Sequence, residues 1–370
     1  MKIVVFGLAV TSSWGNGHAT LWRALGNALG RAGGELVFFE RDQGFYARTR
    51  DGAPLPGIRL VLYRDWPSIR AWAVAETQAA DLALVTSFCP DGPAAADVVR
   101  AHARLPAYYD MDTPVTLASL ADTPAPYLPA DGLRGFDLVL SYTGGRALDG
   151  LATALGATRV RPLFGSVDPD AYTPIGPSGG ANDNARWAAL SHLGTYAGDR
   201  RPALEKLFFE PARRLDRLPF LLGGAQYPDD LALPANVRFV SHVAPDRHRD
   251  FYGAAPLSLN ITRQAMAAMG FCPSGRLFEA AACGVAVISD PWEGLETFFT
   301  PGEEILIART AADVVDAIGL GPQALSRIGR RARERVLAEH TADRRIAELS
   351  RLVAAVGRSV RSDPEPMAHP

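Results

Sequence analysis

The chain has 370 residues, of which 48% are hydrophobic and 21% charged, and its formal net charge is −2. This composition is ordinary for a globular protein, and the length exceeds the usual size of one hydrophobic core, so we expect two domains. A nearly neutral chain has no general attraction to nucleic acid or to an anionic membrane surface. No apolar run approaches the roughly 20 residues that cross a bilayer. We therefore expect neither a nucleic-acid partner nor an integral membrane segment.

The cysteines and the start of the chain bear on the cellular compartment of the protein. Three cysteines, Cys89, Cys272 and Cys283, are too few for a disulfide framework and lack the CxxC or CxxH spacing of a metal site. A reducing cytoplasm is the expected setting. Residues 2–10 have the outline of a short secretory signal, but residues 15–18 do not form a small-residue cleavage site. A first buried strand is therefore favoured.

Residues 1–171 alternate short apolar runs with amphipathic stretches. The clearest helical face carries Leu21, Trp22, Leu25 and Leu29. Strand–helix–strand alternation with nearly continuous apolar strands predicts a parallel sheet covered on both faces, which would form an N-terminal domain. The predicted strands are 2–8, 35–39, 58–62, 82–86, 106–109, 136–141 and 159–163, and the other predicted helices are 66–77, 94–103 and 145–155.

A second domain of similar build is predicted at 188–340, after a Gly-, Pro- and Asn-rich linker at 172–187. A helix at 341–358 follows the completed domain and is a candidate to cross back onto the first one, and 359–370 is expected to be a disordered tail. The fold class is thus α/β, with two Rossmann-like domains facing a central cleft. The predicted strands are 188–193, 219–222, 237–240, 257–261, 285–289 and 304–308, and the predicted helices are 201–215, 245–254, 275–283, 311–318 and 322–338.

The strongest local signal is the segment 272–290. Ser274 can cap a helix whose first residue, Gly275, lets a ligand approach the backbone, and such a helix start suits a phosphate. Arg276 adds a fork of donors in the first turn. Glu279, one turn later, could accept hydrogen bonds from two ribose hydroxyls. A plain helix–turn–strand unit with a surface glutamate is the alternative.

These residues resemble a family. The segment 279–290, Glu-Ala-Ala-Ala-Cys-Gly-Val-Ala-Val-Ile-Ser-Asp, is similar to the donor-binding segment of GT-B glycosyltransferases of the glycogen-synthase-like superfamily. With 259–263 and 290–294 it looks closest to the CgeB-like glycosyltransferases. Segments 7–29, 164–172 and 193–196 also match, so the resemblance runs over about 1–356.

The resemblance implies a GT-B fold and a nucleotide-sugar donor bound mainly by the C-terminal half, with Glu279 on the ribose and no metal ion or cofactor. Many members of the superfamily carry a second glutamate eight positions earlier, which contacts the sugar. That position is Phe271 here, so the familiar sugar-contacting carboxylate is absent.

Candidate catalytic residues come from the first half. His18 follows Gly15 and Gly17 at a helix start and could contact the reacting sugar or act as a base; capping the helix is its alternative role. Asp110 and Asp112 follow a strand and are expected to point the same way, and Asp112 is the second catalytic candidate. Turn capping and a metal-binding Asp-x-Asp are the alternatives for this pair.

The first loop also approximates an NAD fingerprint, with Glu40 after the next strand, but Thr20 replaces its third glycine and the gap from Gly7 to Gly15 is too long. Arg263 is expected to meet the diphosphate. Arg200 and Arg201 open a helix and are expected to do the same, since an anionic ligand would relieve cations at a helix start. His242 is expected to line a nucleobase pocket. A surface location is the alternative for each arginine, and a structural role for His242. The complete predicted donor site is Gly15, Gly17, Tyr196, Arg200, His242, Asn260, Thr262, Arg263, Ser274, Gly275, Arg276, Leu277 and Glu279.

The predicted function is glycosyl transfer from a UDP-, dTDP- or GDP-linked sugar to a carbohydrate, glycan or other small-molecule acceptor. Arginines and a helix start would stabilise the leaving diphosphate without a metal ion, and retention of configuration is favoured over inversion. Three alternatives remain open: a nucleotide-sugar epimerase of the same fold, a noncatalytic nucleotide-sugar-binding protein, and an NAD-dependent dehydrogenase.

Overall fold

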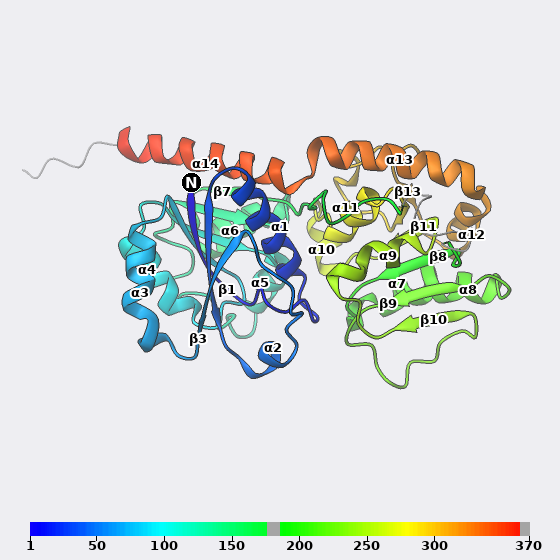
Figure 1. Cartoon of the computed structure of the whole chain (residues 1–370), viewed down its shortest axis with the longest axis horizontal. Coiled ribbons are helices and arrows are strands. Elements are labelled where there is room, and N and C mark those ends of the chain that lie inside the picture. Colours follow the sequence, from blue (N-terminus) through cyan, green and yellow to red (C-terminus); the bar gives the residue numbers. More distant parts are fainter. Residues whose placement is uncertain (176–185, 363–370) are drawn as a thin grey trace, which may run out of the picture.

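The computed structural model describes residues 1–175 and 186–362. Residues 176–185 of the predicted linker and 363–370 of the predicted tail lie outside the described residues. Two α/β domains lie side by side, and the last helix runs along the N-terminal one (Figure 1). The two-domain prediction is confirmed.

The N-terminal domain is built on a parallel seven-stranded sheet in the order β3-β2-β1-β4-β5-β6-β7. Its central strands are buried along their whole length because helices cover both faces. The strands are β1 (Lys2–Gly7), β2 (Glu35–Arg41), β3 (Ile58–Tyr63), β4 (Leu82–Thr86), β5 (Pro106–Asp110), β6 (Leu138–Ser141) and β7 (Val160–Pro162).

The helices of this domain follow the predicted alternation. Helix α1 begins after Asn16, whose side chain accepts a hydrogen bond from the His18 backbone N–H at 3.1 Å, as expected of an N-cap. The helices are α1 (Gly17–Arg31), α2 (Gly44–Arg48), α3 (Trp66–Gln78), α4 (Gly92–His102), α5 (Thr113–Ser119) and α6 (Arg146–Leu155).

The C-terminal domain has a parallel six-stranded sheet in the order β10-β9-β8-β11-β12-β13. The predicted helix 201–215 is α7 and α8 joined by a π-helical turn, Glu205–Phe209. The strands are β8 (Leu190–Leu193), β9 (Phe220–Gly223), β10 (Val237–Val240), β11 (Leu257–Asn260), β12 (Ala286–Ser289) and β13 (Leu306–Ile307), and the helices are α7 (Arg201–Leu204), α8 (Glu210–Arg214), α9 (His248–Gly253), α10 (Gln264–Met269), α11 (Gly275–Ala282), α12 (Ala311–Gly319) and α13 (Gly321–Glu339). The last helix of the chain is α14 (Ala342–Ser362).

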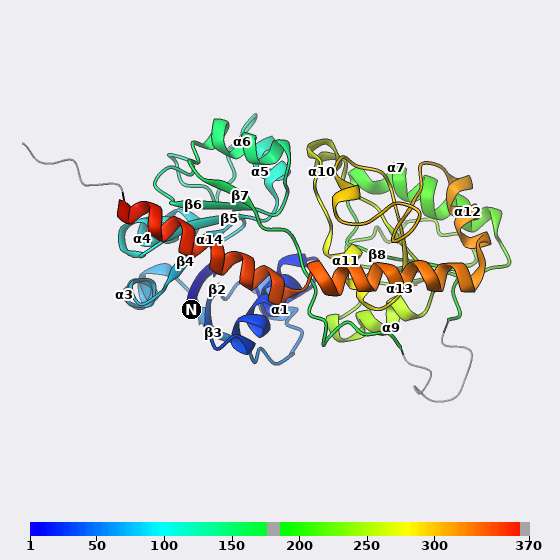
Figure 2. The same cartoon turned by 90° about the horizontal axis from the view of Figure 1, so that it is seen from above.

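Helix α14 returns to the N-terminal domain, as the sequence predicts. Figure 2 shows it continuing beyond α13 and crossing above the first sheet. Its buried Ile346 and Leu349 belong to the same core as Leu25 and Leu29 of α1. A bridge between Val167 and Thr341 fixes the crossing point. Over residues 1–175 and 186–362, none of the helices is both long and apolar enough to span a membrane.

Candidate functional site

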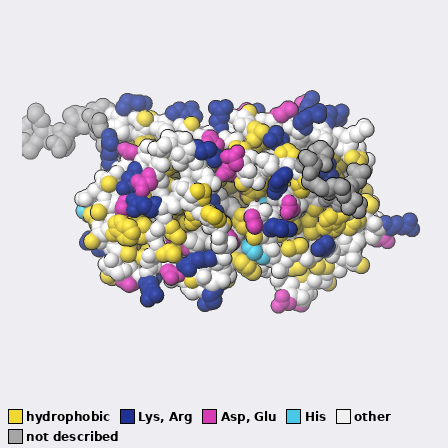
Figure 3. Space-filling view, viewed as in Figure 1, with side chains coloured by type: hydrophobic (Ala, Val, Ile, Leu, Met, Phe, Trp, Pro, Cys, Tyr) yellow, Lys and Arg dark blue, Asp and Glu magenta, His cyan; other side chains and the backbone are white. Residues whose placement is uncertain are grey.

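A cavity of about 670 Å³ lies between the two domains. The first loop, the start of α1 and the carboxyl ends of β5 and β6 line it from the N-terminal domain. The loops after β8, β9 and β10 and the start of α11 line it from the other side. Figure 3 shows histidine side chains at the boundary between the two lobes. Parallel sheets bind ligands at this edge, where their strands end.

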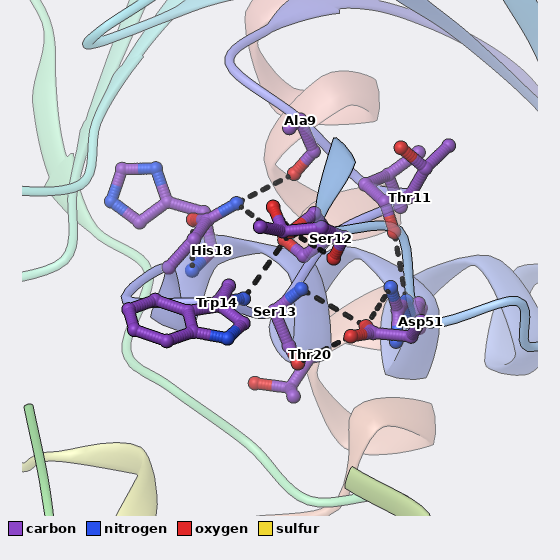
Figure 4. A network of polar contacts seen from close by, with 12 residues as sticks. Ala9, Thr11, Ser12, Ser13, Trp14, His18, Thr20 and Asp51 are labelled. Atoms are coloured by element: carbon purple, nitrogen blue, oxygen red, sulfur yellow. Dashed lines mark hydrogen bonds and ion pairs between the residues drawn. The ribbon is translucent and has the colours of Figure 1, made fainter. Parts of the chain in front are cut away.

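Two buried carboxylates hold the first loop in place. Glu40 accepts hydrogen bonds from the backbone N–H groups of Val10 and Thr11, at 2.7 and 3.0 Å. Asp51 accepts one from the Ser13 backbone at 2.9 Å. Figure 4 shows Asp51 on one side of this loop, with the rings of Trp14 and His18 on the other.

The Glu40 carboxylate therefore serves to hold the first loop. Glu40 is 1% exposed and binds backbone groups of its own domain, so it does not offer its carboxylate to the ribose of a dinucleotide. The same loop places Gly15, Gly17 and His18 on the cavity wall.

His18 and Asp112 form a pair at the cavity. His18 Nε2 lies 2.8 Å from Asp112 Oδ2. An ionised carboxylate only accepts hydrogen bonds, so Nε2 carries the proton and Nδ1 of the neutral ring is an acceptor. His18 Nδ1 is buried, with no partner among the described residues. Asp112 is the N-cap residue of α5, but its side chain does not cap the helix.

Asp110 does not share this orientation, contrary to expectation. Strand β5 ends at Asp110, and the chain then turns into α5, so the alternation of a strand does not extend to Asp112. Asp110 is fully buried and accepts hydrogen bonds from the Asp112 backbone and the Thr116 hydroxyl. Burial raises the pKa of Asp110 to about 7.

The start of α11 lies on the opposite wall. Ser274 occupies the N-cap position, but its hydroxyl donates to Asn260 Oδ1 at 2.8 Å instead of capping the helix. Arg276 Nη1 donates to the same oxygen at 2.9 Å. A Cβ built on Gly275 would meet only Glu279 Oε1 and Tyr142 Oη, both at 3.8 Å. The backbone here is thus open to a ligand.

Three arginines from different segments gather beside this helix start. Burial, together with the nearby charges of Arg276 and Arg263, lowers the pKa of Arg200 to about 10. Arg200 Nη1 donates to the Thr195 carbonyl at 2.8 Å, whereas its buried Nε has no partner in the described part of the chain. Buried positive charge with unused donors favours an anionic ligand.

Arg263 is only partly neutralised, since its Nε lies 3.5 Å from Asp199 Oδ2. The arginines and the start of α11 therefore form one anion-binding wall, which we define as Arg200, Arg263, Ser274, Gly275 and Arg276.

Glu279 lies one turn beyond this wall on the same face of α11. Tyr252 donates its hydroxyl hydrogen to Glu279 Oε2 at 2.9 Å, and His248 Nδ1 lies 3.7 Å from the same oxygen. The glutamate is on the cavity surface and is not a freely solvated side chain. A carboxylate here can accept hydrogen bonds from hydroxyl groups of a ligand.

Two further predicted residues line the cavity. Tyr196 packs against Tyr227, with ring centroids 5.4 Å apart. His242 stacks on Trp14 of the other domain at 5.4 Å, and burial lowers the pKa of His242.

Three predicted residues lie behind the cavity wall, which corrects the prediction. Leu277 is fully buried because it is one position past Arg276, about 100° around the helix, and faces the core. Asn260 is 1% exposed and holds Ser274 and Arg276 from behind. Thr262 donates to the Asp290 carboxylate with its backbone and its hydroxyl.

Phe271 has a different role from the glutamate that the family resemblance would place there. Its carbonyl accepts a hydrogen bond from the Gly144 backbone at 2.9 Å, and its side chain packs over Gly145. The residue thus connects the two domains. It has a positive φ of 47°, an uncommon conformation for a non-glycine residue.

Five residues are examples of what sequence reasoning missed on the cavity surface. They come from scattered loops and helices that carry no recognisable motif, so only the three-dimensional fold brings them together. They are Tyr142, Gln226, His248, Tyr252 and Met266. In the described part of the chain, no three His, Cys, Asp or Glu side chains gather as a metal site would require.

Comparisons with known proteins agree with this geometry. Residues 200–351 match the family model described as glycosyl transferase-like, and a comparison with curated protein sequences gives no match. Sucrose-phosphate synthase from Thermosynechococcus elongatus is a structural neighbour at 16% identity, with a TM-score of 0.66 over 97% of this chain and 100% of that one.

Two other neighbours were solved with ligands. HepE from Anabaena, in complex with UDP-glucose, is 13% identical, with a TM-score of 0.64 over 96% of this chain and 100% of that one. The catalytic domain of starch synthase IV from Arabidopsis thaliana, bound to ADP and acarbose, is 12% identical, with a TM-score of 0.64 over 96% and 99%. The chain therefore has the GT-B fold. Within it, residues 200–351 carry the sequence pattern of the glycosyl transferase-like family.

Proposed function

We propose that the chain is a glycosyltransferase that takes a sugar from a nucleotide-diphosphate-sugar donor. The observation that carries this proposal is the anion-binding wall beside the Glu279 carboxylate in one cavity. The wall suits a diphosphate and the carboxylate suits a pentose. HepE, which shares this fold, was solved with UDP-glucose, which supports a donor of this class.

The leaving group of such a transfer is a nucleoside diphosphate, which gains negative charge as the glycosidic bond breaks. Arg200, Arg263 and Arg276 would stabilise that charge with donors that are already in place, which is commonly a large term in catalysis. These arginines supply the positive charge that a metal ion would otherwise provide, so we propose transfer without a metal ion or cofactor.

The sugar end of the donor would reach the pair His18 and Asp112. Asp112 holds the His18 ring, and the free Nδ1 would accept a hydrogen bond from a sugar hydroxyl or from the acceptor. We favour retention of configuration, because the superfamily that the sequence resembles leans that way. The acceptor, a carbohydrate, glycan or other small molecule, would enter from the N-terminal domain.

We also infer that the chain is CgeB-like and cytoplasmic. Support for the first comes from the motifs at 259–263 and 279–294. Three free, buried cysteines are consistent with a reducing compartment. The absence of a nucleic-acid partner stays a prediction from net charge, and one structural neighbour, an alpha-glucosyltransferase, was solved with UDP and DNA.

A thermal-shift screen with UDP, GDP, ADP and dTDP tests donor binding, since a ligand of the folded state raises the melting temperature. We expect one of them to stabilise the wild-type chain. Glu279→Gln should lower the affinity for that nucleotide about tenfold, because it removes a charge-assisted hydrogen bond. Unchanged affinity in Glu279→Gln would refute the ribose assignment. NAD is included as the ligand of the dehydrogenase alternative.

Incubation with labelled nucleotide-sugar separates the remaining alternatives. A transferase needs an acceptor to turn the donor over efficiently, whereas an epimerase converts the donor alone. Turnover that is abolished in His18→Ala and Asp112→Ala, with donor binding retained, would exclude a purely noncatalytic binding protein.

A further inference from the structure

Glu279 is the end of a connected group of four side chains that begins at the joint between the domains. We define the carboxylate network as Tyr172, His248, Tyr252 and Glu279. All four are buried or nearly so: Tyr252 is 0% and Tyr172 7% exposed, and the side chains of His248 and Glu279 are 13% and 12% exposed.

The first contact fixes one oxygen of the carboxylate. Tyr252 on α9 donates to Glu279 Oε2 at 2.9 Å. The other oxygen, Oε1, lies 3.8 Å from the position of a Cβ on Gly275 and so faces the start of α11. Fixing Oε2 therefore determines the direction in which Oε1 points.

The second contact sets the tautomer of His248. Its Nε2 lies 3.1 Å from the Val243 carbonyl oxygen, which can only accept, so Nε2 carries the proton. Nδ1 of the neutral ring then accepts the hydroxyl hydrogen of Tyr172 at 3.0 Å. The ring is held on both sides and packs beside Glu279 Oε2 at 3.7 Å, a contact too long for a hydrogen bond.

The third contact anchors the network to the joint between the domains. The Tyr172 backbone N–H donates to the Asp168 carbonyl at 3.1 Å. The Asp168 carboxylate in turn accepts from Asn27 of α1 at 3.0 Å. The Tyr172 backbone is therefore tied to the N-terminal domain, while its phenol contacts a histidine of the C-terminal domain.

We propose that Tyr252, His248 and Tyr172 are positioning residues that orient Glu279 for two adjacent hydroxyls of a nucleotide pentose. The inference deepens the proposed function and rests on it. A core built only for packing would use phenylalanine at these sites, because a buried hydroxyl is costly unless it is hydrogen-bonded. A carboxylate that is held in one rotamer before binding loses less conformational freedom when it binds.

The test compares each nucleoside diphosphate with its 2′,3′-dideoxy counterpart, using UDP, ADP and GDP and titration calorimetry. We expect the wild-type chain to prefer the ribonucleotide by about tenfold or more, and Glu279→Gln to lose most of this preference. Tyr252→Phe removes only the hydroxyl on Oε2, and we expect it to reduce the preference about threefold or more. Tyr172→Phe should reduce it in the same direction and remains informative if Tyr252→Phe does not fold.

The matched control is Tyr109→Phe. It also removes a buried phenol hydroxyl, one that donates to the Leu163 carbonyl at 2.6 Å in the N-terminal domain, and it should leave the ribonucleotide preference unchanged. A preference that persists in both network variants, with Glu279→Gln affected, would overturn the inference and leave the proposed function standing. If the wild-type chain binds dTDP but none of these three diphosphates, the inference fails and the proposed function stands. If it binds neither dTDP nor any of the three, the proposed function fails and the inference fails with it.

Discussion

Arg200 is a side chain that we expect to destabilise the free protein and to favour binding of an anion. Its Nε is buried without a partner among the described residues, and burial and two neighbouring arginines lower its pKa to about 10. Replacing a buried, uncompensated charge by an apolar side chain of similar length is often neutral or stabilising. We therefore expect Arg200 to lower the free energy of unfolding of the free protein and to raise its affinity for an anion.

We predict that Arg200→Met leaves the free energy of unfolding unchanged or raises it by about 1 kcal/mol, and weakens diphosphate binding by about tenfold or more. Denaturation and calorimetry measure the two effects separately. Arg201→Met, at the exposed neighbouring position, is the control and should leave binding intact. Loss of stability together with retained binding would assign Arg200 a structural role.

Asp110 predicts a pH dependence of stability. Burial raises its pKa to about 7, above the roughly 3.9 of an exposed aspartate. The folded chain keeps the proton at pH values where the unfolded chain has lost it. Its contribution to stability is therefore fully present below about pH 4 and is lost as the pH rises through 7.

Urea unfolding of the wild-type chain and Asp110→Asn, compared between pH 4.5 and 8, isolates this contribution. We expect the difference in free energy of unfolding to shift by roughly 1–4 kcal/mol in favour of the variant as the pH rises. Parallel stability curves for the two proteins would contradict the prediction.

The limits of residue-level prediction follow from geometry. Spacing within 274–279 predicted that Ser274, Gly275, Arg276 and Glu279 lie together, since residues one turn apart share a helix face, and all four line the cavity. The prediction that Leu277 lines the cavity was wrong, because which face of α11 points to the cavity depends on where the core lies. Tyr252 and His248 could not be found by spacing, as they meet Glu279 only through tertiary contacts.

Among secondary-structure elements, buried strands and amphipathic helices were predicted well, and three short helices were not. Helices α2, α5 and α10 have five to seven residues, too few for a period of 3.6 to be visible. Their formation depends on tertiary contacts, which compensate the cost of nucleating a short helix. All three lie near the cleft, where α10 continues from Arg263 towards the Phe271 contact.

Helix α11 gives a prediction that separates stability from binding. A methyl group on Gly275 meets only ordinary van der Waals contacts, and Gly→Ala in a helix commonly stabilises by about 0.4–1 kcal/mol. Yet that methyl would project into the space where the anion-binding wall opens. Gly275→Ala should keep or slightly raise the melting temperature and weaken diphosphate binding by about tenfold.

The control for this helix is Gly319→Ala in α12, where an added Cβ meets nothing within 4 Å and which does not line the cavity. Gly319→Ala should leave diphosphate affinity unchanged and should change the melting temperature only slightly. Equal effects of the two substitutions on diphosphate affinity would show that the start of α11 is not the phosphate site.

At the level of the two domains together, α14 makes the N-terminal domain depend on the end of the chain. Its Ile346, Leu349 and Val356 complete a core that contains Leu25 and Leu29 of α1. Residues 1–171 alone would leave that face of α1 uncovered. The crossing at Val167 and Thr341 also places this helix beside the joint from which Tyr172 reaches the C-terminal domain.

We therefore predict that Leu349→Ala, a substitution in the last helix, destabilises the first domain by about 2–5 kcal/mol, the usual cost of a cavity in a well-packed core. Calorimetry should show a lower transition for the N-terminal domain, while the transition that is raised by bound nucleotide diphosphate changes less, because the C-terminal sheet has a core of its own. Arg351→Ala, on the exposed face of α14, should leave both transitions in place. If Leu349→Ala lowers both transitions equally, the two domains unfold as one cooperative unit, and α14 stabilises the whole chain through the joint.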